Sequence, residues 1–294
     1  MTTAADVKSG KGSRDENFPV ASALIAARHR APILAYYRFA RAADDVADNP
    51  KLAESEKLRL LDGLEATLLG WNDSDVEALP LRRALAERGM APTHALDLLT
   101  AFRQDVTKRR YETWDELIDY CRHSAMPVGR FVLDVHGEDK ATWEPSDSLC
   151  AALQIINHLQ DCGKDYRDMD RVYVPLDALA EHGARVEDLA APKAPPALRA
   201  CIEELTLKTQ SLMPDAANLP RTVHDLRLSA ETAVIVKLAN SILQLLLTRD
   251  PLSERVHLSK PQALSIAARG AAGAVIGKIG RGISGASALR GAGR

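Results

Sequence analysis

Two short segments of this 294-residue chain place carboxylates at four-residue steps. The first, YYRFARAADDVAD, contains Asp44 and Asp48, and the second, QIINHLQDCGKD, contains Asn157, Asp161 and Asp165. Residues four apart on an α-helix lie on one face, about one turn from each other. Like charges so placed repel each other. The apolar residues before both segments predict partial burial, which raises the free energy of the ionised carboxylates further. The spacing therefore predicts that cations compensate these carboxylates.

Carboxylate pairs beside basic residues suit divalent cations that bridge a polyanionic group. Mg²⁺ prefers oxygen ligands and is usually bound by one or two carboxylates together with substrate phosphates. Arg38 and Arg41 precede the first pair, Arg171 follows the second, and Asn157 offers a neutral oxygen. A solvated acidic face is the simpler interpretation of one such pair. Two pairs on two apolar helices favour a site with two or three Mg²⁺ ions on a diphosphate.

The elements that must position these side chains are predicted to be helices. Ala, Leu and Arg dominate the composition and strand-forming residues are sparse. Pro32, Pro92 and Pro175 stand where helix starts are expected. The apolar periodicity predicts helices over residues 19–29, 32–48, 52–71, 76–89, 92–110, 114–136, 146–166, 175–183, 196–217 and 226–248.

The short connections between these helices favour one all-α domain over residues 18–260. Two helical subdomains, divided near 137–146 or 184–196, are the alternative, but loops of that size are ordinary within a domain. We expect residues 1–17 to be a flexible N-terminus and residues 261–294 to be a Gly/Ala-rich basic tail. From Ala267 onward the glycine density predicts little regular structure. The tail's weak apolar and cationic character would suit contact with an anionic membrane, although a solvated tail is the simpler interpretation.

Composition and motifs exclude several other functions. The chain has 38 basic and 40 acidic residues and 4 % aromatics, which disfavours a nucleic-acid partner. Four cysteines without a CxxC pair, and no signal peptide, predict reduced thiols in the cytoplasm. We find no apolar run of the roughly 18 residues that would span a membrane. The sequence GRGISG at 280–285 lacks the preceding strand of a dinucleotide-binding motif.

The two aspartate segments resemble those of the squalene/phytoene synthase family of head-to-head prenyl synthases. The resemblance extends from about Asn17 to Arg255 and rests on a combination of motifs: Arg41-Ala-Ala-Asp44 with Asp48, YCRHSAMPVG at 120–129, Gln154-xx-Asn157-xxx-Asp161-xxx-Asp165, and Arg171-x-Tyr173-x-Pro175. It implies an all-α isoprenoid synthase fold, in which the motifs face each other across a deep apolar cavity. It also implies a prenyl diphosphate substrate, from which Mg²⁺-assisted loss of diphosphate generates an allylic or cyclopropylcarbinyl cation.

The same resemblance implies a role for each matched residue. The metal ligands would be Asp44, Asp48, Asn157, Asp161 and Asp165. The diphosphate would be held by Arg41, Arg171, Tyr173 and, from the alignment of the ERV segment, Arg255. Tyr120 and Gln154 would line the reaction centre, where Tyr120 and the four aspartates would be catalytic. Phe18 would pack near the prenyl chain, and plain core packing is the alternative for Phe18 and Tyr120. A family tyrosine of the late helix falls on Leu238.

Departures from the usual family motifs narrow the resemblance to one branch of the family. Ser124-Ala125-Met126 replaces the usual Val-Ala-Gly, and Gln160 replaces the arginine that usually stands before the first aspartate of the second motif. These changes, with NFPVAS and FARAADD, resemble the bacterial hydroxysqualene synthases of squalene and hopanoid pathways. That branch would convert presqualene diphosphate and water to hydroxysqualene, so NADPH is not expected. The enzyme would be cytoplasmic, or peripheral at the inner membrane, with transient membrane or pathway-enzyme contacts.

Two further hypotheses remain open from the sequence. A sister enzyme of the family would condense two farnesyl or geranylgeranyl diphosphates into presqualene diphosphate, squalene or phytoene. A protein of another class would be a non-catalytic, lipid-binding helical scaffold, which the intact aspartate motifs argue against. The product formed from a single substrate separates the first two hypotheses.

Overall fold

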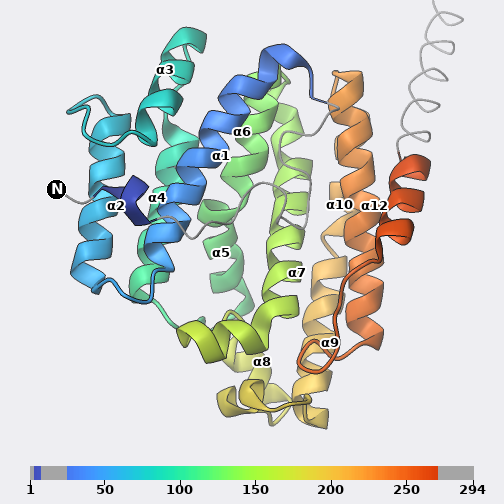
Figure 1. Cartoon of the computed structure of the whole chain (residues 1–294). Coiled ribbons are helices and arrows are strands. Elements are labelled where there is room, and N and C mark those ends of the chain that lie inside the picture. Colours follow the sequence, from blue (N-terminus) through green and yellow to red (C-terminus); the bar gives the residue numbers. More distant parts are fainter. Residues whose placement is uncertain (1–2, 8–24, 271–294) are drawn as a thin grey trace, which may run out of the picture.

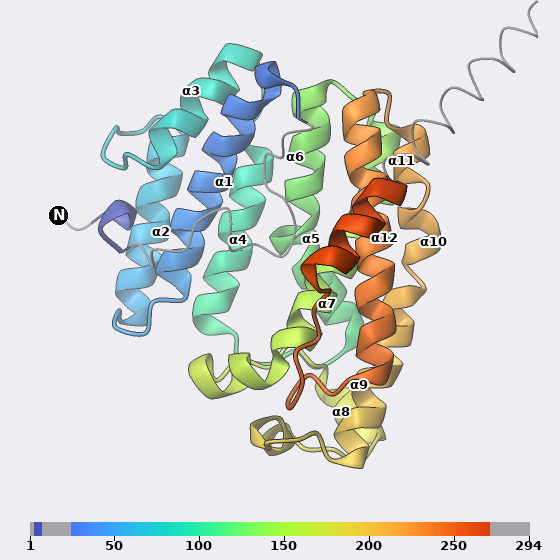
Figure 2. The ribbon, with the colours of Figure 1, turned by 45° about the vertical axis from the view of Figure 1, so that its right-hand side comes forward.

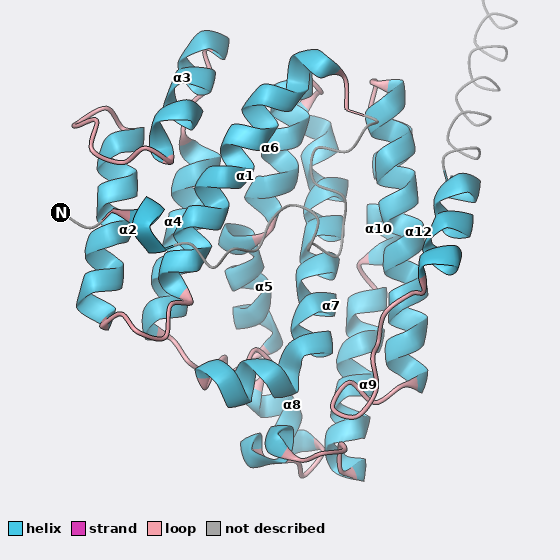
Figure 3. Ribbon diagram, viewed as in Figure 1, coloured by secondary structure: helices cyan, strands magenta, loops and turns pink. Residues whose placement is uncertain are grey.

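The computed structural model describes residues 3–7 and 25–270, and these residues form helices and loops without a strand (Figure 3). An isolated β-bridge joins Arg110 to Val172. The helices are η1 (Ala4–Val7), α1 (Ala27–Ala47), α2 (Glu54–Leu68), α3 (Ala78–Arg88), α4 (Thr93–Thr107), α5 (Trp114–Ser124), α6 (Met126–His136), η2 (Lys140–Thr142), α7 (Trp143–Met169), α8 (Leu176–Glu181), η3 (Val186–Ala190), α9 (Pro196–Gln210), α10 (Met213–Ala216), α11 (Leu219–Thr222) and α12 (Leu226–Thr248). The all-α prediction is confirmed.

The long helices stand side by side in an order that the chain largely follows. In Figure 1, α2, α4 and α1 lie at one side, α6, α5 and α7 in the middle, and α9 and α12 at the other side. One buried apolar cluster joins α1 to α4, and a second joins α5 to α12. Both α4 and α6 contribute buried side chains to both clusters, and Val132 packs against each of them. The two clusters are therefore continuous across these helices.

Several helix boundaries differ from the sequence prediction, for local reasons. The single helix expected over 114–136 is two, because Ala125 has φ −126° and ψ −45° and Pro127 follows it at the start of α6. Pro32 does not begin a helix but lies inside α1, where it leaves the Arg28 carbonyl without its usual donor. The Arg88 guanidinium donates to that carbonyl at 2.5 Å. A side chain from α3 thus supplies the hydrogen bond that proline cannot.

Other helices differ in length or number from those expected from the sequence. The stretch 196–217 divides into α9 and α10, and α7 extends the expected 146–166 helix at both ends. Most of the expected 19–29 helix lies outside the described residues. Residues 260–270 are helical, so regular structure continues three residues past Ala267, and the rest of that segment lies outside the described residues. This last helix packs on α12, where Lys237 Nζ donates to the Arg269 carbonyl at 3.2 Å (Figure 2).

Helix α12 is both long and apolar. Among the described residues it is the one helix whose length and hydropathy would suit a membrane span. In its 18-residue apolar stretch, 44 % of the residues are buried in the protein. It packs against α7, α9 and α11. Core helices of globular proteins share these properties, so the length and hydropathy of α12 are weak evidence for a membrane span.

Close packing of α6 on α7 depends on Gly129. A Cβ at this position would overlap Ser146 Oγ and approach Cys150 Sγ to 2.6 Å. We expect Gly129→Ala to lower the free energy of unfolding by about 1–3 kcal/mol, measured by urea denaturation, because overpacking forces the helices apart. Gly63 in α2 is the control, since it has open space around it. Gly63→Ala should stabilise the protein by up to about 1 kcal/mol, and destabilisation of equal size by both variants would contradict the packing argument.

Candidate active site

The two carboxylate segments line one cavity with a volume of about 650 Å³. Asp44 lies in the last turn of α1, and Asp48 caps its C-terminus. Asn157, Asp161 and Asp165 lie in the C-terminal half of α7. The C-terminus of a helix carries partial negative charge, which disfavours carboxylates nearby. Both helices therefore direct excess negative charge to the same end of the cavity.

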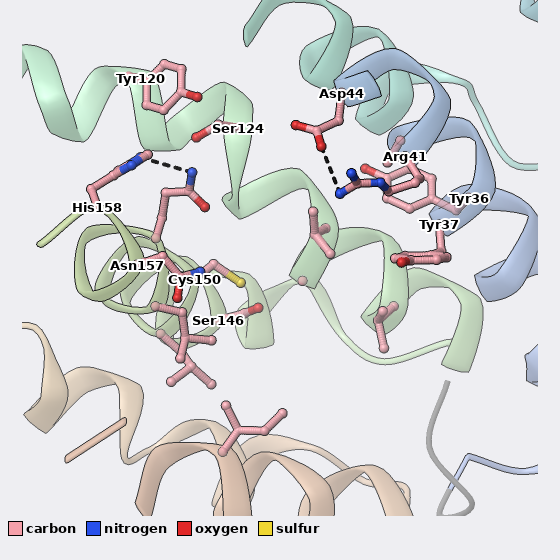
Figure 4. Close-up of a pocket in the computed structure, with 18 of the residues that line it drawn as sticks. Tyr36, Tyr37, Arg41, Asp44, Tyr120, Ser124, Ser146, Cys150, Asn157 and His158 are labelled. Atoms are coloured by element: carbon pink, nitrogen blue, oxygen red, sulfur yellow. Dashed lines mark hydrogen bonds and ion pairs between the residues drawn. The ribbon is translucent and has the colours of Figure 1, made fainter. Parts of the chain in front are cut away.

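Two arginines partly neutralise the segment on α1. Arg41 contacts Asp44 at 2.9 Å and Asp45 at 2.7 Å. Arg171 is buried; its Nη1 lies 2.5 Å from Asp48, and its Nη2 donates to the Ala47 carbonyl at 3.2 Å. Figure 4 shows Arg41 and Asp44 across the cavity from Tyr120 and His158. Arg38, the other arginine noted in the sequence, is exposed and does not line the cavity.

The remaining negative charge shows in the pKa values of two aspartates. Burial, with the neighbouring Asp48 carboxylate, raises the pKa of Asp44 from 3.8 to about 7. Burial and the Asp161 carboxylate raise the pKa of Asp165 to about 7. Near pH 7 these carboxyls are only partly ionised, and a bound cation would favour their ionised form. The groups that could bind a metal are carboxylate and amide oxygens, and the nearby arginines do not fully balance the negative charge of the carboxylates. Mg²⁺ prefers oxygen ligands and would supply positive charge, so these residues fit this ion.

A buried aspartate that the sequence analysis missed organises the adjoining wall. Asp105 of α4 accepts hydrogen bonds from the Tyr120 hydroxyl at 2.8 Å and the Tyr173 hydroxyl at 2.7 Å. Burial raises the pKa of Asp105 to about 6, although Arg171 opposes the shift. Burial, reinforced by Asp105, raises the pKa of both phenols well above 10, so they stay protonated as donors. A lone acid in the helical stretch FRQDV was the only signal in the sequence.

His158 is a second cavity residue that sequence reasoning did not single out. Its ring stacks on that of Tyr173, with centroids 3.6 Å apart. Gln154 Nε2 lies 3.1 Å from His158 Nε2, and because an amide nitrogen donates, the ring nitrogen accepts. Burial and the Arg171 charge lower the pKa of His158 to about 3. The imidazole is therefore neutral near pH 7.

Away from the aspartates the cavity wall is largely apolar. These side chains come from α1, α4, α6, α7, α11, α12 and the segment before α1: Ile25, Ile33, Ala40, Phe102, Val128, Val132, Leu133, Leu149, Leu153, Leu219, Leu228 and Ile235. Tyr36 and Tyr37 add aromatic surface (Figure 4). The site therefore has a charged end and an oily end, as an amphipathic ligand would need.

Ten of the twelve predicted site residues line this cavity: Arg41, Asp44, Asp48, Tyr120, Gln154, Asn157, Asp161, Asp165, Arg171 and Tyr173. Arg255 is exposed and does not line it. Phe18 lies outside the described residues. Leu238 of α12 is also absent from the wall, to which this helix contributes Glu231 and Thr232 among others. Gln160 turns away from the cavity and donates to the Val256 carbonyl.

The family model for squalene/phytoene synthase matches residues 12–262. The chain belongs to the squalene/phytoene synthase family. This family member is 60 % identical over 271 residues to a hydroxysqualene synthase of Rhodopseudomonas palustris, and the match covers 92 % of each chain. It is 51 % identical over 272 residues, again 92 % of each chain, to the hydroxysqualene synthase of Zymomonas mobilis. The predicted family and its hydroxysqualene synthase branch are confirmed.

Solved structures of the family have the same fold as this family member. A squalene synthase from Alicyclobacillus acidocaldarius matches with a TM-score of 0.69 and 30 % identity over 76 % of this chain and 85 % of that one. A dehydrosqualene synthase in complex with a ligand matches with a TM-score of 0.71 over 87 % of this chain and 90 % of that one. At 22 % identity the second match speaks for the fold alone. The isoprenoid synthase fold and the enzyme class are thereby confirmed.

Proposed function

We propose that this enzyme converts presqualene diphosphate and water into hydroxysqualene and diphosphate. The proposal rests chiefly on relatives named hydroxysqualene synthase, which are 51–60 % identical across nine-tenths of the chain. The cavity supports it, because acidic and basic groups meet at one end and apolar side chains line the rest. A diphosphate would lie at the charged end and the two prenyl chains along the apolar wall.

We propose that Asp44, Asp48, Asn157, Asp161 and Asp165 hold two or three Mg²⁺ ions. When bound, these ions would neutralise the diphosphate as it leaves. Among the described residues, no three His, Cys, Asp or Glu side chains are grouped closely enough to hold a metal by themselves. The substrate's phosphate oxygens would therefore supply the remaining ligands, which is the usual arrangement for Mg²⁺.

The chain's own groups would hold the leaving group and shelter the cation. Arg41 and Arg171 keep positive charge beside the aspartates, where a guanidinium binds phosphate oxygens well. Tyr36, Tyr37 and Tyr120 present neutral aromatic rings to the cavity, and such rings attract a cation electrostatically. The apolar wall excludes bulk water from the prenyl chains, so the cation would not be quenched at random.

The product formed from presqualene diphosphate tests this proposal. Purified enzyme with Mg²⁺ and no NADPH is expected to form hydroxysqualene, detected by gas chromatography–mass spectrometry. In ¹⁸O-labelled water the hydroxyl should carry the label, because the oxygen comes from solvent. Complete consumption of the substrate without an alcohol product would rule the proposal out.

Head-to-head condensation of two prenyl diphosphates is the second candidate. Relatives named phytoene synthase match at lower identity, 32 % over 60 % of the chain for Enterobacter agglomerans and 38 % over 43 % for Thermus thermophilus. Farnesyl diphosphate or geranylgeranyl diphosphate as the sole substrate separates the two activities. Appearance of presqualene diphosphate, squalene or phytoene in that reaction would favour condensation.

The stability of the metal-free enzyme should depend on pH because of its carboxylate cluster. A carboxyl whose pKa rises from 3.8 to about 7 binds more protons in the folded state, so stability falls as pH rises between these values. In EDTA, the free energy of unfolding should thus decrease from pH 5 to pH 8. Asp165→Asn removes one such group and should reduce that decrease by about 2 kcal/mol, as an order of magnitude. Identical pH profiles for wild type and variant would contradict this.

A further inference from the structure

Ser124, at the C-terminal end of α5, has a hydroxyl oxygen that is buried and has no hydrogen-bond partner. Among the hydroxyls that line the described cavity, it is the one in this state. Serine and threonine on a helix commonly donate to the carbonyl four residues earlier. Thr206 and Thr209 do so here, each at 2.7 Å. The Ser124 hydroxyl instead remains available to a molecule in the cavity.

The neighbours of Ser124 also offer hydrogen-bonding capacity toward the cavity. Tyr120 lies one turn earlier on the same face of α5 and donates its only hydroxyl proton to Asp105, so toward the cavity its oxygen acts as an acceptor. Gln154, across the cavity on α7, has one amide proton and its carbonyl oxygen left after the His158 contact. Figure 4 shows Ser124 and Tyr120 on the same side of the cavity, near His158.

From this arrangement we propose that Ser124, with Tyr120 and Gln154, holds the water molecule that adds to the carbocation. A buried water typically needs two to four polar partners, and these three groups supply them. Acceptance of its two protons by the Ser124 and Tyr120 oxygens would point a water lone pair away from them, toward the substrate carbon. Ser124 is then a residue that determines which product forms. This inference rests on the proposed function.

The reaction balances without an oxidant or reductant. The carbon–oxygen bond to the diphosphate breaks, and its electron pair leaves with the diphosphate. The water oxygen donates a lone pair to the cationic carbon to form the new carbon–oxygen bond. The proton released from the resulting oxonium passes to an oxygen of the departed diphosphate, which is the strongest base that the reaction itself supplies. Without a held water, the same cation would lose a proton from carbon and give a hydrocarbon.

The end of α5 fixes where the Ser124 side chain lies. The break at Ala125 ends α5 directly after Ser124. Because a helical Cβ tilts toward the N-terminus of its helix, the Ser124 side chain lies over the turn that contains Tyr120. The two oxygens therefore act on one region of the cavity.

Product partition in Ser124 variants tests the inference. Wild type, S124A, S124V and S124T are incubated with presqualene diphosphate and Mg²⁺, and both diphosphate release and the ratio of alcohol to hydrocarbon are measured. We expect S124A and S124V to lower the alcohol-to-hydrocarbon ratio about five-fold, the effect of losing one hydrogen bond to water. Diphosphate release should stay within about two-fold, and S124T should retain the alcohol. S124A removes only one oxygen, so it remains informative if S124V folds poorly.

Ser148→Ala is the matched control, because the Ser148 hydroxyl donates to the Glu144 carbonyl and does not line the cavity. Its product ratio should equal that of wild type. An unchanged ratio in both S124A and S124V would overturn the inference and leave the proposed function standing. A wild-type enzyme that releases diphosphate without forming an alcohol would overturn both.

Discussion

Asp161→Asn is expected to lower the turnover of presqualene diphosphate by at least about 100-fold, because a group that stabilises developing charge in a protected site contributes on this scale. Asp161 lies between Asn157 and Asp165 on the cavity face of α7. Its replacement removes one negative charge from the proposed Mg²⁺ ligands while the side chain keeps its shape. Initial rates of diphosphate release at saturating Mg²⁺ would measure the loss.

The same substitution should not harm the fold. Asp161 is among the causes that raise the pKa of Asp165, so its neutralisation relieves repulsion between two carboxylates one turn apart. We therefore expect the free energy of unfolding of the metal-free variant to equal or exceed that of wild type. A large loss of activity in a protein that is at least as stable identifies a functional group.

Asp168→Asn provides the control, since Asp168 belongs to the same helix and is exposed away from the cavity. Its turnover should stay within about two-fold of wild type, because an exposed charge outside the cavity interacts weakly through water. Equal losses in the two variants, or full activity in Asp161→Asn, would contradict the assignment of α7 as a metal-binding helix.

The carboxylate rows could be predicted from the sequence because a four-residue step is local information. Any helix through Asn157, Asp161 and Asp165 places them on one face, whatever the rest of the fold does. Asp105 gave no such signal. Its role depends on Tyr120 and Tyr173, which come from other segments and meet it only in the folded chain. A single acid in a helix is usually a surface residue, so its partners had to be seen in space.

The helix boundaries show the same division between local and long-range causes. The start of α6 next to Pro127 follows from proline chemistry, yet the break before it was hidden by an apolar periodicity that continues through both helices. Pro32 was misleading for the opposite reason. Proline is expected at helix starts because inside a helix its missing N–H leaves a carbonyl without a hydrogen bond. Here the Arg88 side chain of α3 donates to that carbonyl, which belongs to Arg28. A contact between residues sixty apart cannot be inferred from either segment alone.

The variant Arg171→Met is expected to lose about 2–3 kcal/mol of unfolding free energy, less than a fully buried ion pair because Asp48 is 39 % exposed. Arg171 is 5 % exposed and contacts Asp48 at 2.5 Å. Its charge also lowers the pKa of Asp105, which burial alone would raise further. Without it, Asp48 loses its ion-pair partner and the buried Asp105 loses a charge that favours its ionised form. Urea denaturation at pH 7 would measure the change.

Two comparisons make this expectation specific. Arg122→Met alters an arginine that is 63 % exposed and pairs with the exposed Asp119, so its cost should stay within about 1 kcal/mol. Combining Arg171→Met with Asp105→Asn should cost less than the sum of the single changes, because Asp105→Asn removes a carboxylate that Arg171 would otherwise neutralise. Strict additivity would mean that Arg171 does not act through Asp105. A positive coupling would show that the cation holds together the acidic end of the cavity, where the proposed chemistry begins.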